Sequence, residues 1–357
     1  MSDKSIVVAG AGGNIGSHLT ESLARMSNVG RVTLIDLDIY EARNIANQDI
    51  ISRDVGKPKA LVQARRLLEI RPNLEVNAIY APLETLPLAA WRADLIVACL
   101  DSRSARQAVN QRAWRLGVPW VDSGVLGSEW LARVNAYTPA EGAACLECAW
   151  SDEDYRLLEQ QYPCGGGANS SAPNGASSEL GALAAAMLAI ECRKILVGEL
   201  ECAAVGQQVT FNARWHRFAA TSFRRNPQCR FDHATWAIEP LRCDTGEMRI
   251  SDLLTTEGSV SVPGQRFVRR LVCSVCGKER RLFRLDGSLD PALRQCSACG
   301  MTMAVPGFDI IEGLDGGLPA DVMNQTLDRT GLRYGDVLLR GARYFEITAN
   351  TVMADET

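Results

Sequence analysis

The sequence is poor in several features that would narrow its function at once. Of its 357 residues only three are histidine, and aromatic residues make up 6%. No apolar run approaches the ~20 residues that a membrane-spanning helix needs. The net charge of −4 gives no basis for bulk binding to nucleic acid or anionic lipid. The first predicted strand begins so early that no signal segment fits before it. We therefore expect a cytoplasmic protein that contacts neither membranes nor nucleic acid.

Cysteine, in contrast, is abundant. The chain has 12 cysteines, and six of them form three Cys-x-x-Cys pairs. In a cytoplasmic protein such pairs indicate metal or thiol chemistry rather than disulfides. The length allows two or three domains, and the 46% hydrophobic content is typical of a globular protein.

A glycine-rich turn follows the first predicted strand, residues 5–9. Its glycines are Gly10, Gly12, Gly13 and Gly16, and a helical pattern follows them. A second strand, residues 31–35, ends in Asp36. Such a turn lets backbone N–H groups at a helix start approach a phosphate. Because Ile15 occupies the third glycine position of the dinucleotide fingerprint, the turn alone leaves a ligand-free strand-to-helix turn open.

Strands and helices alternate after Asp36. The pattern predicts a helix from residue 58, strands at 75–80 and 94–100, a helix from 104 and a strand at 119–122. This order predicts an α/β fold with a Rossmann-like, doubly wound sheet. Asp36 and Asp101 both follow strands, so we expect them to face one pocket at the carboxyl edge.

Five ordered segments carry a family resemblance. They are Gly12-Gly13, Asp36 with Asp38, residues 44–48, residues 56–60, and residues 101–106 with Asp101 and Arg106 at their ends. Over about the first 240 residues the chain resembles the adenylation domain of ubiquitin-activating and sulfur-carrier-activating enzymes, the ThiF/MoeB type. The resemblance implies an enzyme that uses ATP and Mg²⁺ to activate a carboxylate.

The resemblance also implies roles for individual residues. Asp36 would accept hydrogen bonds from ribose, Asn44 would contact phosphate, Lys59 would meet phosphate oxygens, and Asp101 would hold Mg²⁺. The implied nucleotide-binding set is Gly10, Gly12, Gly13, Gly16, Asp36, Asp38, Asn44, Gln48, Lys59, Asp101 and Ser102. The plainer alternatives are a surface lysine at 59 and a helix cap at Asp101.

Two departures from the family pattern stand out. Asn47 occupies the position of a phosphate-bridging arginine, and Arg43 or Arg53 could supply the charge instead. The sequence also starts without the family's N-terminal helix, which lends an arginine across the interface of simple homodimers. The resemblance nevertheless implies a homodimer.

Two groups of residues are candidate zinc ligands. The resemblance implies that Cys145 and Cys148 form a zinc pair that is completed near the end of the adenylation domain, where Cys229 and His233 would make a structural Cys₃His site. Asp232 is a further possible ligand, and a merely buried Cys229 is the alternative. Cys273, Cys276, Cys296 and Cys299 predict a Cys₄ zinc ribbon. The ribbon's basic residues favour a solvated face over an RNA contact.

Cys164 lies in a segment rich in glycine and serine before a predicted helix at 179–197. A thiol there would be accessible, and the helix N-terminus would lower its pKa. It is a candidate catalytic thiol that accepts the activated acyl group as a thioester; an unreactive loop cysteine is the alternative.

Three segments divide the chain: an adenylation domain (1–242), a zinc-ribbon segment (243–303) and a small α+β tail (304–357). In the tail we expect a helix at 318–330 and a hairpin turning at 340–342. The tail suggests docking of a protein substrate or a conjugating enzyme.

The leading hypothesis is ATP-dependent adenylation of the C-terminal glycine of a ubiquitin-like or sulfur-carrier protein in a bacterial conjugation system. Adenylation of a peptide or a tRNA-linked carboxylate, an NAD(P)-dependent oxidoreductase, and a non-catalytic ATP-binding scaffold remain alternatives.

Overall fold

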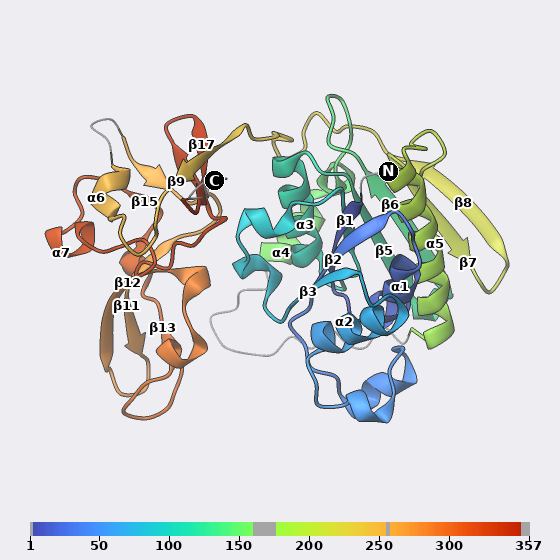
Figure 1. Ribbon diagram of the computed structural model, residues 1–357, viewed down its shortest axis with the longest axis horizontal. Coiled ribbons are helices and arrows are strands. Elements are labelled where there is room, and N and C mark those ends of the chain that lie inside the picture. The colour runs from blue at the N-terminus through green and yellow to red at the C-terminus, as the bar shows by residue number, and fades with distance from the viewer. Residues whose placement is uncertain (1–2, 160–175, 255–257, 351–357) are drawn as a thin grey trace, which may run out of the picture. The chain divides into compact units, whose positions relative to one another are not determined.

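The computed structural model describes residues 3–159, 176–254 and 258–350 (Figure 1). The chain divides into two compact units. Unit 1 contains Met1–Glu84 and Trp91–Thr235, and unit 2 contains Thr85–Ala90 and Trp236–Thr357. The three sequence segments bounded at residues 242 and 303 stay a prediction.

Unit 1 is built on one eight-stranded sheet with the order β3-β2-β1-β4-β5-β6-β7-β8. The first five of these strands run parallel, and β6, β7 and β8 continue the sheet antiparallel. The strands are β1 (Lys4–Ala9), β2 (Val29–Ile35), β3 (Glu75–Ile79), β4 (Leu95–Ala98), β5 (Trp120–Leu126), β6 (Leu131–Tyr137), β7 (Gln207–Asn212) and β8 (Arg217–Ser222). The predicted α/β, Rossmann-like fold is confirmed.

Within the described residues of unit 1, five α-helices and short 3₁₀ turns connect these strands (Figure 1). The helices are α1 (Asn14–Ala24), α2 (Lys59–Ile70), α3 (Arg103–Leu116), α4 (Asp152–Glu159) and α5 (Ser178–Val197). The 3₁₀ turns are η1 (Ala42–Ala46), η2 (Ser52–Asp54), η3 (Leu83–Thr85), η4 (Leu88–Trp91), η5 (Gly127–Glu129) and η6 (Leu146–Ala149). Helix α5 packs against α1, β5 and β6, and its buried Ala184 and Ala185 allow this close approach.

The register of the parallel strands aligns their carboxyl ends. Ala9 pairs with Ile35 on one side and with Ala98 on the other, and Ala98 pairs with Asp122. Strands β1, β2, β4 and β5 are therefore level here, and the residues that follow these positions lie together. Below them the apolar side chains of β1, β4, α1 and α5 form the main core, whose largest members include Leu19, Leu23 and Leu188. This core fixes the edge on which the candidate site lies.

Unit 2 contains two small sheets. One has the order β15-β10-β16-β17-β9, and in the other β11 pairs with β12, β13 and β14. Their bounds are β9 (Ile238–Arg242), β10 (Val260–Ser261), β11 (Phe267–Cys273), β12 (Glu279–Leu285), β13 (Met303–Ala304), β14 (Ile310–Ile311), β15 (Gly313–Leu314), β16 (Val337–Arg340) and β17 (Arg343–Thr348). The helical segments are α6 (Ile250–Leu253), α7 (Ala320–Met323), η7 (Asp286–Ser288), η8 (Pro291–Arg294) and η9 (Gly307–Asp309).

The tail confirms one expectation and overturns another. Strands β16 and β17 form the predicted antiparallel hairpin, and Gly341 has a φ of +61° in its turn. The predicted helix at 318–330 is wrong, because only α7 is helical there. The Leu327 N–H donates to the Met248 carbonyl, and the Leu327 side chain is fully buried in the unit 2 core. This tertiary contact replaces the helical hydrogen bonds that the local pattern favoured.

The burial of Asp336 predicts that the stability of unit 2 depends on pH. Its side chain is 1% exposed, burial raises its pKa to about 6, and its Oδ1 has no hydrogen-bond partner in the described part of the chain. The folded pKa exceeds the usual 3.8, so stability present below pH 4 is lost as the pH rises through 6. We expect Asp336→Asn to raise the free energy of unfolding by about 2 kcal/mol at pH 7.5 and to change it little at pH 4.

Urea unfolding across this pH range measures the effect, and hydrogen exchange of the β16 and β17 amides assigns it to unit 2. A variant with the same pH dependence as the native chain would show that Asp336 does not cause it.

Candidate active site and metal centres

The glycine turn joins the ends of β1 and β4. Gly10 has a φ of +77°, and a Cβ there would lie 2.4 Å from the Cys99 carbonyl oxygen. A Cβ on Gly12 would lie 2.3 Å from the Cβ of Lys59 and 2.8 Å from the Tyr40 hydroxyl. Glycine is therefore required at both positions by close approach of neighbouring groups. Helix α1 begins directly after the turn, with Gly13 as its N-cap residue.

Asp36 fastens the turn to the end of β2. Its Oδ2 accepts a hydrogen bond from the Gly12 N–H at 2.8 Å, and its Oδ1 accepts one from the Asp38 N–H at 3.0 Å. The side chain is buried, and this burial raises the pKa of the carboxyl, whereas the two backbone donors and Lys59 oppose the shift. Each oxygen retains a lone pair, so both can accept a further hydrogen bond.

Lys59 lies beside this carboxylate. It is the first residue of α2, and its side chain is only 8% exposed. Its Nζ donates to Asp38 Oδ2 at 3.1 Å and lies 5.6 Å from the centre of the Tyr40 ring. Neighbouring Lys57 is exposed. The alternative of a solvated surface lysine therefore fits residue 57 and not residue 59.

Tyr40 is a member of this site that sequence reasoning missed. It is 1% exposed, and its hydroxyl accepts a hydrogen bond from Gln63 Nε2 at 2.7 Å. Burial raises the pKa of the phenol well above its usual value. Tyr40 thus supports both Gly12 and Lys59 from beneath. The sequence around Tyr40 gives no signal for this role, because the role depends on the contact between Tyr40 and Gln63 of α2.

The loop that carries Asn44 and Gln48 is held by ionic contacts. Asp49 Oδ2 accepts a hydrogen bond from Arg66 at 2.6 Å, and the Asp49 N–H donates to Ser17 Oγ at 3.0 Å. Asn44 Oδ1 accepts the Glu41 N–H, and the buried Gln48 Oε1 has no partner among the described residues. The loop is fixed, and Gln48 offers an unused acceptor.

Neither Arg43 nor Arg53, the arginines nearest to Asn47 in the sequence, is identified by its contacts as the substitute for the phosphate-bridging arginine of the family. Arg43 forms an ion pair with Glu41, and Arg53 is exposed. The replacement for the phosphate-bridging charge therefore stays unassigned.

Asp101 lies after β4 at the same edge of the sheet. It is exposed, and it does not cap the following helix, because Ser102 Oγ accepts the Ala105 N–H at 3.1 Å as the N-cap of α3. Asp101 follows Cys99, whose carbonyl contacts the turn at Gly10. The structure thus joins Gly12, Asp36, Asp38 and Lys59 through hydrogen bonds and close packing. Asp101 lies on the adjoining segment, and within the described residues it makes no hydrogen bond or ion pair with Lys59.

The Cys₃His group forms a closed cluster in unit 1. The ligand atoms of Cys145, Cys148, Cys229 and His233 all lie within 4.8 Å of one another. The Sγ atoms of Cys145 and Cys148 are 3.9 Å apart, and those of Cys145 and Cys229 are 3.8 Å apart. Tetrahedral Zn²⁺ with bonds of about 2.3 Å separates its sulfur ligands by about 3.8 Å. The donor set and its spacing therefore fit zinc.

Asp232 is not a member of this cluster. Its carboxylate forms an ion pair with Arg115, while the His233 ring packs edge-on against Trp114 with centroids 4.9 Å apart. The fourth ligand position thus belongs to histidine.

The Cys₄ group forms the second cluster, in unit 2. Sγ–Sγ distances are 3.5 Å for Cys273–Cys299 and Cys276–Cys296, and 3.7 Å for Cys276–Cys299. Each pair lies in a tight turn closed by a glycine, with φ values of +70° at Gly277 and +72° at Gly300. All four donors are within reach of one tetrahedral ion. The predicted catalytic thiol, Cys164, lies outside the described residues.

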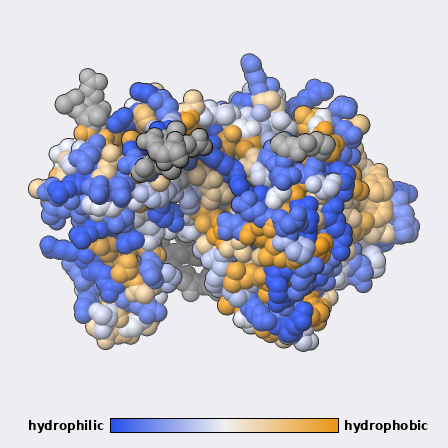
Figure 2. All heavy atoms as spheres, in the orientation of Figure 1, coloured by the Kyte–Doolittle hydropathy of each residue, from blue (hydrophilic) through white to orange (hydrophobic). Residues whose placement is uncertain are grey.

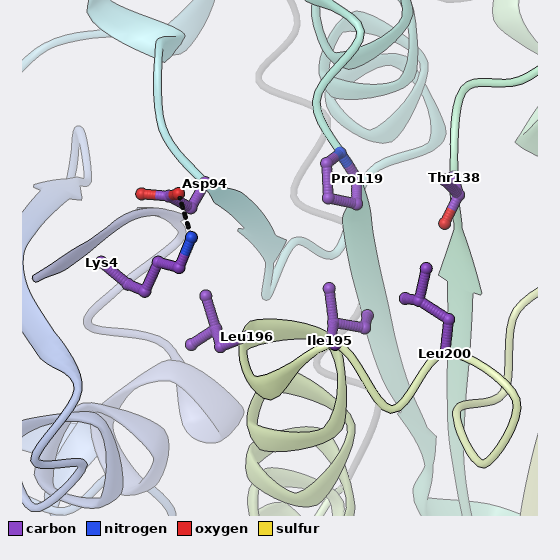
Figure 3. A pocket seen from close by; sticks show the side chains of 8 residues that line it. Lys4, Asp94, Pro119, Thr138, Ile195, Leu196 and Leu200 are labelled. Carbon is purple, nitrogen blue, oxygen red and sulfur yellow. Dashed lines mark hydrogen bonds and ion pairs between the residues drawn. The ribbon is translucent and has the colours of Figure 1, made fainter. Parts of the chain in front are cut away.

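A small pocket lies at the other end of the unit 1 strands, away from the candidate site (Figure 3). Lys4 Nζ and Asp94 Oδ1, 2.9 Å apart, close one side of it, and Ile195, Leu196 and Leu200 line the other. Because Lys4 begins β1 and Asp94 precedes β4, the pocket lies at the amino ends of the strands. It is separate from the candidate site.

Apolar side chains also reach the surface of the protein (Figure 2). A group of them belongs to the segment between β2 and α2 and to the first turn of α2, next to Asp36 and Lys59. These side chains are 43–53% exposed: Leu37, Ile39, Ile45, Ile51 and Leu61. Within the described ranges, every helix is too short or too polar to cross a bilayer.

Comparison with known proteins links this site to a family. The model of the ThiF family matches residues 1–231. The chain is 31% identical to the sulfur carrier protein adenylyltransferase of Thermus thermophilus over 230 residues, which cover 63% of this chain and 80% of that protein. It is 27% identical to the molybdopterin-synthase adenylyltransferase of Escherichia coli over 232 residues (64% and 87%). Identity to ubiquitin-like modifier-activating enzyme 5 of Dictyostelium discoideum is 26% over 244 residues (63% and 60%).

Solved structures show the same architecture. E. coli MccB crystallised with ATP superposes with a TM-score of 0.53 at 23% identity, covering 64% of this chain and 65% of that one. MccB with succinimide gives 0.53 at 24% identity, covering 64% and 66%. At these identities the likeness establishes the fold.

Proposed function

The chain belongs to the ThiF family, and from this premise we propose that it is an ATP-dependent adenylyltransferase. Its acceptor is the C-terminal glycine of a ubiquitin-like or sulfur-carrier protein. A carboxylate oxygen of the acceptor attacks the α-phosphorus of ATP, the bond from that phosphorus to the pyrophosphate oxygen breaks, and acyl-AMP and pyrophosphate are formed. The relatives named as adenylyltransferases and modifier-activating enzymes support this reaction.

The observation that carries the proposal is the joining of Gly12, Asp36, Asp38 and Lys59 at the start of α1. Backbone N–H groups at a helix start and a nearly buried ammonium group suit a polyphosphate. The spare lone pairs of Asp36 suit ribose hydroxyls. Catalysis of this type depends mainly on positioning and on neutralising charge at phosphorus, which is the role of Lys59.

Asp101 is the residue that would hold Mg²⁺. Its carboxylate is exposed at the same edge and is not needed to cap α3. A bound Mg²⁺ would neutralise charge on the phosphates, and it binds well through one or two carboxylate oxygens. The two cysteine clusters would hold structural Zn²⁺, because neither leaves an open ligand position.

A protein acceptor agrees with the exposed aliphatic side chains of the segment that carries Asp36 and Lys59, from Leu37 to Leu61. Unit 2 provides a further surface, which we propose serves the acceptor or a conjugating enzyme in a bacterial ubiquitin-like system. Thioester transfer to Cys164 and a homodimeric assembly stay predictions from the sequence.

Exchange of radiolabelled pyrophosphate into ATP tests the reaction. We expect exchange only when a cognate carrier protein with a free C-terminal glycine is added. Asp101→Ala should remove it, because the metal would lose its protein ligand. Exchange that persists in this variant would refute the Mg²⁺ assignment, and thermal stabilisation by NAD but not by ATP would favour an oxidoreductase. Stabilisation by ATP without exchange for any carrier would favour the scaffold.

A further inference from the structure

Two arginines share one buried carboxylate beside the candidate active site. Asp122 on β5 is 0% exposed. Its Oδ1 accepts a hydrogen bond from Arg106 Nε on α3 at 2.9 Å, and its Oδ2 accepts one from Arg133 on β6 at 2.7 Å. Two guanidinium groups and one carboxylate leave this cluster with a formal charge of +1. A buried excess charge of this kind is costly unless it has a further partner.

The two arginines differ in how many of their guanidinium N–H groups have an acceptor. Arg106 also donates to the carbonyl oxygens of Leu100 at 2.5 Å and Ser123 at 3.3 Å, so it fastens the segment that leads to Asp101. Arg133 donates to Asp122 through one terminal nitrogen, and the same nitrogen donates to the Asn135 side-chain oxygen at 2.6 Å when that amide takes the orientation that satisfies both of its polar atoms. Within the described chain, its Nε and second terminal nitrogen have no acceptor, and its side chain is 21% exposed. One edge of this guanidinium is therefore open.

Gly124 makes room for this arrangement. A Cβ at this position would lie 3.1 Å from a terminal nitrogen of Arg133 and 3.2 Å from one of Arg106. Gly124 also pairs with Arg133 across β5 and β6. The lack of a side chain lets both guanidinium groups lie against the strand.

The cluster lies on the side of the site that a nucleotide would leave free. Ala98 pairs with Asp122, so the cluster is level with the carboxyl end of β4 and one strand spacing, about 4.8 Å, from it. Asp36, the candidate ribose partner, follows β2 on the other side of β1. A nucleotide with its ribose at β2 and its phosphates over β1 and β4 leaves β5 and β6 for the second substrate.

We infer that the open edge of Arg133, held in place by Asp122, binds the C-terminal carboxylate of the acceptor and directs it toward the nucleotide. This inference rests on the proposed function. A guanidinium edge matches the two oxygens of a carboxylate in geometry, and such paired, charge-assisted hydrogen bonds are stronger than neutral ones. The site selects a free carboxylate, because a C-terminal amide offers one acceptor and no charge.

A peptide pair tests this selectivity on the full chain. The probes are a fluorescein-labelled pentapeptide ending in Gly-Gly with a free carboxylate and the same peptide ending in an amide. Fluorescence anisotropy is measured with saturating Mg²⁺ and α,β-methylene ATP, whose bridge between the α- and β-phosphates is not cleaved, so the peptide binds without being adenylated. We expect the free acid to bind at least tenfold more tightly than the amide, and Arg133→Gln to abolish this difference while the affinity for the ATP analogue changes less than twofold.

Two control variants test whether the discrimination depends on the guanidinium group of Arg133. Arg133→Lys keeps the charge but not the fork, and it should retain part of the discrimination. Arg31→Gln removes an exposed arginine of β2 that pairs with Glu75, and it should leave the discrimination unchanged. Thermal melts confirm that each variant is folded. Equal binding of acid and amide to the native chain, or discrimination that survives Arg133→Gln, overturns the inference.

The pyrophosphate assay separates this inference from the proposed function. Discrimination that depends on Arg133 without exchange for any carrier would keep the carboxylate site and reject adenylation. Exchange with a carrier, combined with discrimination that does not depend on Arg133, would keep adenylation and reject the site.

Discussion

Lys59→Gln is expected to slow carrier-dependent pyrophosphate exchange by about 10²–10³-fold, which is the usual effect of losing one preorganised group that stabilises a developing negative charge. The ammonium group is held by Asp38 and the Tyr40 ring, and the side chain is 8% exposed, so it is oriented before substrate binds. Glutamine keeps most of the side-chain length but not the charge. Exchange rates at saturating ATP and carrier, with and without the substitution, measure the effect.

Lys57→Gln is the matched control for this prediction. Lys57 is exposed, two residues earlier in the same segment, so its loss changes the net charge equally without touching the site. We expect its exchange rate to stay within twofold of the native chain. Equal losses in both variants, or more than a tenth of the native rate in Lys59→Gln, would show that Lys59 does not contact the phosphates.

Loss of the fold does not account for the expected result. The partner of Lys59, Asp38, has a side chain that is 56% exposed, and an ion pair with such access to water contributes little to stability. The melting temperature of Lys59→Gln should therefore remain close to that of the native chain. A fall in activity without a fall in melting temperature identifies a functional role.

Much of the site could be predicted because it is encoded locally. The glycine turn and Asp36 each follow a strand that the apolar pattern identifies, and parallel strands bring such positions to one edge. The ordered motifs then point to Lys59. The Cys₄ cluster is predicted from spacing and the Cys₃His cluster from the family resemblance, and the structure places His233 rather than Asp232 with the unit 1 cysteines.

The parts that escaped prediction depend on contacts between distant residues. Tyr40 acquires its place from Gln63, and Asp122 acquires its two arginines from α3 and β6. A single aspartate in an apolar strand gives no indication of either partner. Residues 85–90 were not assigned to unit 2, since a short segment between two strands of unit 1 carries no local signal of where it packs. The false helix at 318–330 has the same cause, a tertiary contact that overrides local preference.

The zinc prediction has the second largest expected effect. We expect the purified chain to hold two equivalents of Zn²⁺, and Cys148→Ser to hold one. The unit 1 cluster joins η6 to a segment 84 residues further along the chain, next to Trp114. Because the binding energy of structural zinc becomes folding energy, we expect the free energy of unfolding of unit 1 to fall by at least about 3 kcal/mol. Metal analysis and urea unfolding measure the two effects.

Three controls separate zinc loss from general damage. Cys202→Ser replaces an exposed cysteine outside both clusters and should keep two equivalents. Asp232→Asn should also keep two, because that carboxylate pairs with Arg115. Cys276→Ser should lose the other ion and leave the unfolding of unit 1 unchanged. Two equivalents of zinc in Cys148→Ser would refute the ligand assignment, and an unchanged unfolding free energy after verified loss of the ion would show that the metal does not stabilise unit 1.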